Sequence, residues 1–133
     1  MTRLAPVAGI VAGAMLLLSF VAHTVLGTRE MGRALAATNA PPDLVRGLLV
    51  GWVFGGVGML VFGVLSLRLF LALRRGERES TVPALLIGLA YVGFGLWALA
   101  WSGFDPFFTV FIVPGLLLVA AALLARDGVA GRP

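Results

Sequence analysis

Four long apolar segments, separated by short polar breaks, run through this chain and determine which folds it can adopt. They cover about residues 4–27, 44–73, 82–101 and 106–125. Each is at least as long as the roughly 20 residues that a helix needs to cross the hydrocarbon core of a bilayer. Apolar and polar residues do not alternate within them as they would in half-buried strands. The pattern therefore predicts four transmembrane helices.

The composition points to the same class of protein. Hydrophobic residues make up 60% of the 133 residues and charged residues only 12%, which leaves too few polar side chains to coat a soluble globule. In lipid, backbone polar groups must be satisfied internally, and a helix does this within one segment. The sequence predicts an all-α fold with a single transmembrane domain over 1–133, an antiparallel four-helix bundle surrounded by the lipid bilayer.

Local chemistry marks where three of these helices begin. Two prolines and Asp43 precede the second helix. The hydroxyl residues Ser80 and Thr81 and the following Pro83 mark the start of the third helix. Asp105 and Pro106 mark the start of the fourth. These are the residues that helix N-termini prefer. The polar segment 28–40 is expected to form one or two helical turns along the membrane surface.

The charged residues predict how the helices are oriented. All ten basic residues are arginines at the ends of apolar segments, where they indicate topology rather than a nucleic-acid groove. If successive helices cross the membrane in alternating directions, seven arginines lie on one side and three on the other. The seven are Arg3, Arg68, Arg74, Arg75, Arg78, Arg126 and Arg132, and the three are Arg29, Arg33 and Arg46. Short cytoplasmic segments carry the excess of basic residues, so both termini are predicted to be cytoplasmic. The first apolar segment exceeds a cleavable signal core and is expected to be retained.

The 18 glycines predict close contacts between helices, because small residues let membrane helices approach one another. The candidate packing residues are Gly9, Gly13, Gly47, Gly51, Gly55, Gly58, Gly88 and Gly95. The second helix also carries Gly56 and Gly63 on the opposite face, so it is predicted to be the central helix of a compact bundle. The same faces could equally serve dimerisation.

One group of residues is a candidate binding site. His23, the single histidine, lies within the first helix, and Trp52, Trp97, Trp101 and Glu30 fall in the same outer half of the predicted bundle. A polar residue inside a membrane is a functional-site hypothesis by default. One interpretation is an outward-facing pocket with Glu30 as the carboxylate partner of His23. The other is a belt of interfacial tryptophans with one hydrogen-bonded histidine.

Several kinds of chemistry are not predicted. With no cysteine, the chain cannot form disulfides, thiolate metal sites or iron–sulfur clusters. One histidine supplies too few ligands for zinc or haem, so no metal or cofactor is expected. Ser19 shares a helix with His23 and Asp105 suits a helix cap, which argues against a catalytic triad. The chain is therefore predicted not to be an enzyme.

One stretch of sequence resembles known proteins. The string from His23 to Glu30, HTVLGTRE, together with Arg46 and Trp52, resembles short uncharacterised bacterial inner-membrane proteins with four helices. The similarity covers about the first half of the chain. In that group a histidine often follows the tryptophan, whereas Val53 stands here. The resemblance implies a multi-pass protein of the bacterial inner membrane and implies no activity.

The function predicted from the sequence is therefore a structural one. The chain is expected to be a non-catalytic polytopic membrane protein that acts through helix packing, as a homo-oligomer or as a subunit of a membrane complex. The alternative is a small transporter or ligand-binding protein that uses the outer pocket around His23. Transport usually needs several polar groups near the middle of the membrane, and this chain offers few.

Overall fold

The computed structural model describes residues 4–130, and side chains as far as residue 126. All regular secondary structure in this part of the chain is helical. Four of its helices are long and apolar enough to cross a membrane. Arg3 and Arg132, which contributed to the orientation argument, lie outside the described residues.

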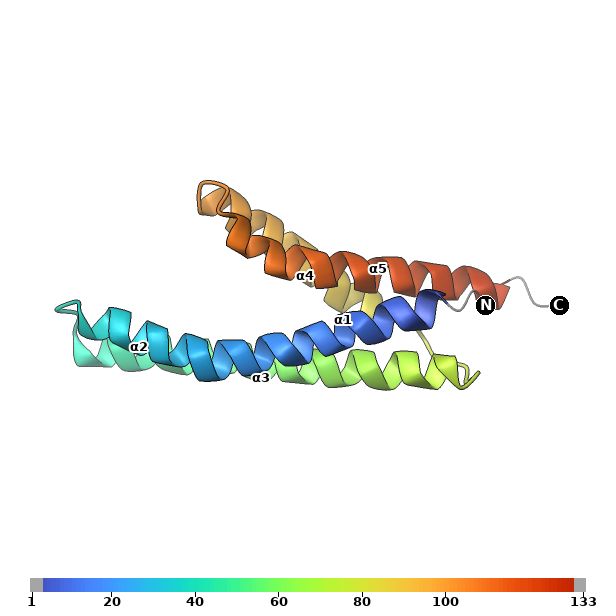
Figure 1. Cartoon of the computed structure of the whole chain (residues 1–133), viewed down its shortest axis with the longest axis horizontal. Helices are drawn as coiled ribbons and strands as arrows, with labels where there is room; N and C mark the ends of the chain where they lie inside the picture. Colours follow the sequence, from blue (N-terminus) through green and yellow to red (C-terminus); the bar gives the residue numbers. More distant parts are fainter. Residues whose placement is uncertain (1–3, 131–133) are drawn as a thin grey trace.

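The first long helix is longer than predicted. It consists of α1 (Leu4–Val21), a π-helical segment η1 (Ala22–Gly27) and α2 (Thr28–Ala36), which together form one continuous 33-residue helix (Figure 1). The predicted end at Gly27 is wrong because Gly27 keeps helical dihedrals, φ −62° and ψ −39°. Segment 28–36 therefore extends the helix instead of turning away from it.

The second long helix runs back beside the first. α3 spans Pro42–Arg74, 33 residues with a proline in its first turn, and is about 50 Å long at about 1.5 Å per residue. Gly76, at φ +87°, ends it: the Gly76 N–H donates to Leu73 O and the Glu77 N–H to Ala72 O. This is a Schellman cap, which favours glycine at the left-handed position.

The remaining helices form a shorter hairpin. α4 spans Val82–Trp101, a 3-10 turn η2 spans Pro106–Phe108, and α5 spans Thr109–Ala130. The carboxylate of Asp105 accepts a hydrogen bond of 2.9 Å from the Phe107 N–H, so this helix begins where the sequence indicated. α5 continues through the buried Pro114.

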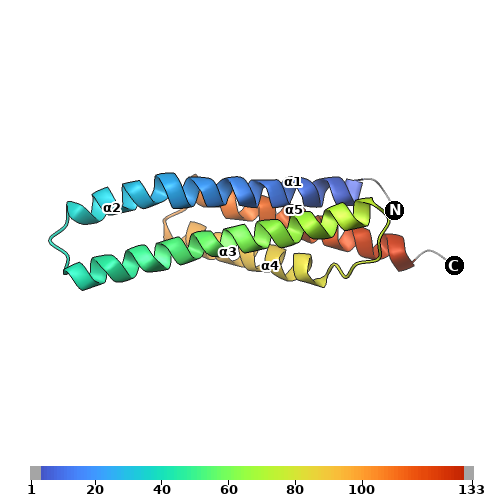
Figure 2. The ribbon, with the colours of Figure 1, turned by 90° about the horizontal axis from the view of Figure 1, so that it is seen from below.

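The two hairpins pack together at one end and diverge toward the other (Figure 1). Seen from below, the α4–α5 hairpin lies behind the two longer helices and covers only part of their length (Figure 2). The beginning of α1 and the end of α5 lie at the packed end. α1 packs closely against both α3 and α5, whereas α3 and α4 touch only slightly. The prediction that the helix over 44–73 is central is therefore wrong, and the arrangement is less compact than the predicted bundle.

Small residues explain why α1 is the central helix. Ala5, Gly9 and Ala12 are buried on it, and a methyl group added at Gly9 would overlap the ring of Phe70 of α3. Phe70 is fully buried there. A helix with such a face can be approached closely by two neighbours, and packing of this kind supplies association energy where water is absent.

The predicted packing glycines fall into two groups. Gly9, Gly13, Gly88 and Gly95 lie in tight helix contacts, where an added Cβ would come within 3 Å of another helix. Gly55 lies beside His23, and Gly58 has only Phe62 of its own helix nearby. Gly47 and Gly51 have no atom within 4 Å of an added Cβ, so they pack against no other described helix of this chain.

The contact between α4 and α5 should not tolerate a side chain at Gly88. A Cβ there would lie 2.8 Å from the backbone oxygen of Gly115, and backbone cannot swing aside as a side chain can. We expect Gly88→Ala to destabilise the detergent-solubilised protein by about 1–3 kcal/mol, measured as a lower thermal unfolding midpoint. Gly93→Ala is the matched control because Gly93 of α4 faces open space. Equal midpoints for both variants would contradict this account.

Candidate functional site

His23 and Trp52 form a reciprocal contact between the first long helix and α3. The distance from His23 Nε2 to the backbone oxygen of Trp52 is 2.8 Å. In return, Trp52 Nε1 donates to the backbone oxygen of His23 at 3.1 Å. The two rings stack with their centroids 4.1 Å apart and their planes 12° from parallel. We call this arrangement the His23–Trp52 clasp.

The clasp determines which nitrogen of His23 carries a proton. A backbone carbonyl oxygen can only accept a hydrogen bond, so Nε2 must be the donor. The proton on Nε2 therefore takes part in the hydrogen bond to the Trp52 carbonyl oxygen of α3, and the indole covers one face of the His23 ring. Only Nδ1 is left as a possible acceptor or ligand atom.

Two glycines make room for the clasp. A Cβ at Gly27 would lie 2.8 Å from the Trp52 ring, and one at Gly56 would overlap the hydroxyl of Thr24. Larger residues at these two positions would push the helices apart. A Cβ at Gly55 would lie 3.5 Å from His23 Nε2, an ordinary van der Waals contact.

The π-helical segment changes which residues share the face of His23. Its hydrogen bonds run from residue i to i+5, so it holds an extra residue compared with an α-turn. Positions after Gly27 are therefore displaced from the face that α-helical spacing predicts. Glu30 is one of them: its carboxylate binds Arg33 at 2.6 Å and its side chain is 69% exposed. Glu30 is paired with Arg33 and not with His23.

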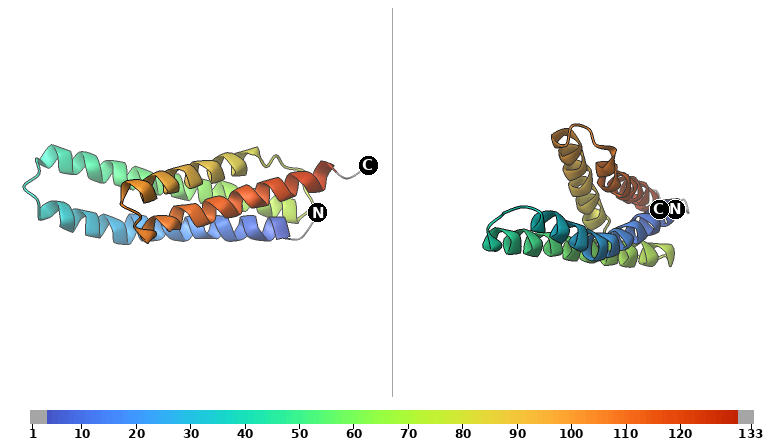
Figure 3. Two further views of the ribbon diagram at one scale, coloured as in Figure 1. Left: turned by 90° about the horizontal axis from the view of Figure 1, so that it is seen from above. Right: turned by 60° about the vertical axis from the view of Figure 1, so that its left-hand side comes forward.

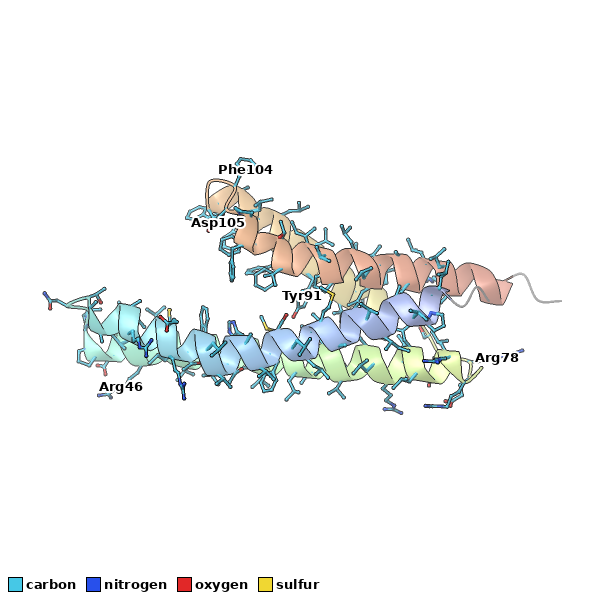
Figure 4. The ribbon with its side chains drawn as sticks, in the orientation of Figure 1. Arg46, Arg78, Tyr91, Phe104 and Asp105 are labelled. Atoms are coloured by element: carbon cyan, nitrogen blue, oxygen red, sulfur yellow. The ribbon has the colours of Figure 1, made fainter. Side chains whose placement is uncertain are left out.

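The other two predicted residues lie on the second hairpin. Trp97 and Trp101 of α4 stack on each other with their centroids 6.0 Å apart, and both are exposed. Both lie in the last turns of α4, and the α4–α5 hairpin diverges from the long helices toward that end (Figure 3). Phe104 and Asp105 mark the tip of this hairpin in Figure 4. The structure therefore brings together two of the five residues proposed for the pocket, His23 and Trp52.

Two buried hydroxyl groups on the same long helix as His23 were not among the predicted site residues. Thr24 Oγ1 and Thr28 Oγ1 are buried and have no hydrogen-bond partner among the described residues. Their spacing of four residues, which places them on one helix face, was the available signal. They make the surroundings of the clasp more polar than its glycines suggest.

The interactions of the clasp are suited to holding two helices together. Within residues 4–130, no group of three or more His, Asp or Glu side chains is arranged to hold a metal ion. The hydrogen bonds and the stacked pair connect two helices at a defined depth and register. A single available nitrogen, Nδ1, does not form a catalytic group by itself.

Comparisons with known proteins provide no relative for this chain: no protein-family model, no curated protein and no solved structure matches it. The resemblance to bacterial four-helix inner-membrane proteins therefore stays a prediction. Functional arguments have to come from the chain's own geometry.

A double-mutant cycle on the clasp should isolate the ring stacking. Both hydrogen bonds go to backbone oxygens, so each survives when the opposite side chain is removed. We therefore expect His23→Ala and Trp52→Ala to show a coupling energy of about 0.5–1.5 kcal/mol, the usual value for an aromatic pair. Unfolding of the solubilised protein would measure it.

Trp101→Ala is the matched control for this cycle because Trp101 stacks on the other hairpin. Its effect should simply add to that of His23→Ala. If the clasp pair were also additive, the stacked rings would contribute nothing to holding the helices together.

Proposed function

We propose that this chain is a non-catalytic, multi-pass membrane protein that self-associates through an exposed glycine face of α3. The proposal has three parts: insertion of the four helices in a bilayer, an orientation with both termini in the cytoplasm, and association of two copies. Each part rests on a different feature of the chain.

Insertion is supported by the exposed surface and by the lengths of the helices. Large apolar side chains such as Val50, Phe54 and Leu86 are more than 60% exposed, which is unfavourable in water. From Gly47 to Arg68, α3 is about 33 Å long, close to the roughly 30 Å of a hydrocarbon core. The clasp then lies about one and a half helical turns inside the outer boundary, near the level that tryptophan favours.

The unequal helices fit the same placement. α4 has 20 residues and is about 30 Å long, enough to cross once. α2 and the first turn of α3, as far as Arg46, then extend beyond the hydrocarbon into water, and this is where Arg29, Glu30 and Arg33 lie. The long hairpin therefore has a protruding polar end that the short hairpin lacks.

The arginine distribution supports the orientation. Arg46 and Arg78 lie near opposite ends of the long hairpin (Figure 4), and the arginine-rich end is the one that carries Arg74, Arg75 and Arg78. Placing that end in the cytoplasm follows the positive-inside rule. Together with the sequence resemblance, it favours a bacterial inner membrane.

The single observation that carries the association proposal is the open glycine face. Gly47, Gly51 and Gly58 lie on the side of α3 opposite Gly56 and Gly63, at helical spacing. A Cβ added at Gly56 or Gly63 would meet the first helix, whereas one added at Gly47 or Gly51 would meet no atom of another helix within 4 Å. Glycine in a water-soluble helix lowers the stability of the helix by about 1 kcal/mol relative to alanine. A row of glycines with no neighbouring helix in the monomer therefore indicates that another helix packs there.

A second copy of the chain suits this face. Two α3 helices related by a two-fold axis would bring the same glycines together, as an isologous contact requires. Small residues spaced in this way let membrane helices approach closely. The alternative of a ligand pocket around His23 is not favoured, because Nε2 and one ring face are engaged by Trp52.

The orientation can be checked with reporters fused to the C-terminus in bacterial cells. We expect an enzyme that is active only in the periplasm to be inactive there, and a fluorescent protein that folds in the cytoplasm to be bright. Fusions made after Asn39, between α2 and α3, should give the reverse result. A periplasmic C-terminus would contradict the proposed orientation.

The association can be checked by enlarging one glycine. Because Gly51 faces open space, Gly51→Leu should leave the monomer folded and block a close helix pair. We expect at least a tenfold weaker dimer, a change of about 1.4 kcal/mol, measured by dilution in detergent. Gly93→Leu, at another open glycine, should dimerise as the unaltered chain does. A monomeric unaltered chain, or equal dimers for both variants, would refute self-association through this face.

A further inference from the structure

A cavity lies between α3 and the beginning of α4, near the end of the molecule where the hairpins pack. Its volume is about 240 Å³, far more than the roughly 10–15 Å³ that one water molecule needs. It is smaller than most drug-sized ligand sites, which begin near about 300 Å³. Its size therefore suits a compact polar group such as a lipid headgroup.

One buried side chain in the cavity wall lacks a partner. Ser66 of α3 is 1% exposed, and its hydroxyl has no hydrogen-bond partner among the described residues. A hydroxyl buried without a partner is costly, by about 1–3 kcal/mol. Ser66 lines the cavity, but its Oγ has less than 1 Å² of accessible surface, so a bound polar group would reach the hydroxyl and remove this cost when the side chain turns toward the cavity.

The cavity also holds one positive and one negative side chain. Arg68 of α3 and Glu79 of the loop before α4 both line it. No ion pair within 4 Å involves either of them in the described part of the chain, although neighbouring Arg75 and Glu77 pair at 2.6 Å. A guanidinium binds phosphate well and a carboxylate binds an ammonium well.

The rest of the wall contains no aromatic ring and is apolar apart from Ser80, whose hydroxyl accepts a hydrogen bond from the Val82 N–H at 3.4 Å. Leu65, Leu69 and Ile87 supply the apolar surface, which suits the first methylene groups of an acyl chain. Recognition of a quaternary ammonium such as choline typically uses an aromatic cage. A primary ammonium instead donates hydrogen bonds, and Glu79 can accept them.

We propose that this cavity binds the zwitterionic headgroup of a phospholipid with a primary amine, phosphatidylethanolamine. Arg68 binds the phosphate, Glu79 accepts hydrogen bonds from the ammonium, and Ser66, with its side chain turned toward the cavity, donates to a headgroup oxygen. The site rests on the proposed membrane insertion and orientation, which put the cavity at the cytoplasmic boundary, where headgroups are found. It is independent of self-association through Gly51.

Native mass spectrometry of the full chain in detergent tests the site. The protein would be offered equal amounts of phosphatidylethanolamine, phosphatidylcholine and phosphatidylglycerol with identical acyl chains. We expect retention of phosphatidylethanolamine to exceed that of either competitor about tenfold, roughly the effect of one charge-assisted hydrogen bond. Equal retention of the ethanolamine and choline lipids would overturn the proposal.

Substitutions assign the roles of the individual groups. Glu79→Gln should abolish the preference for ethanolamine over choline, because the ammonium loses its ionic partner. Arg68→Gln should weaken retention of all three lipids about tenfold. Ser66→Leu should fill the cavity and reduce all three. An ethanolamine preference that persists in Glu79→Gln would refute the assignment of that residue and with it the proposed selectivity.

Matched controls remove the same charges nearby. Arg74→Gln and Glu77→Gln alter the same end of the molecule at residues that do not line the cavity, so both should retain the unaltered preference. The same spectra report whether the protein is monomeric or dimeric. A monomeric Gly51→Leu variant that keeps its ethanolamine preference would separate the lipid site from self-association.

A flotation assay addresses membrane insertion separately. The protein should float with phosphatidylcholine vesicles, and it should do so even when Glu79→Gln has removed the headgroup preference. Flotation without selectivity would reject the lipid site alone. Failure to float would reject the proposed membrane insertion together with the site that depends on it.

Discussion

Close packing along α1 is the constraint on which the rest of the structure depends. α1 lies against both α3 and α5, and it can do so because Ala5, Gly9 and Ala12 give it a flat, small-residue surface. Phe70 fills the space that Gly9 leaves open. If α1 carried large side chains there, the two hairpins would lose the surface that joins them.

The two ends of the molecule have different properties because the hairpins meet only at one of them. At the packed end, α5 covers α1 and the fold has its buried core, including Leu16 and Leu118. Away from it, the long helices are held together by the His23–Trp52 clasp and nearby glycines. The clasp therefore holds the two long helices together by hydrogen bonds and one stacked pair, whereas the buried core holds the helices together at the packed end.

The position of α3 at the edge of the fold leaves two surfaces that the fold does not use itself. The cavity beside Ser66 lies in the space between α3 and α4, and the face with Gly47 and Gly51 is left without a neighbour. Both features depend on α3 lying at the edge of the fold. A compact bundle with α3 at its centre would have covered them.

The sequence by itself determined the number and type of elements, because 20-residue apolar runs can satisfy their backbone only as helices. It also located the start of α3, the start of α4 and the cap at Asp105, where the signals are local. It missed the extension to Ala36, because Gly27 is compatible with both helix and turn. Only the tertiary structure decided which helix is central and that Trp52, not Glu30, is the partner of His23. Those outcomes depend on which faces meet and on a π-helical segment, and no local residue pattern encodes either.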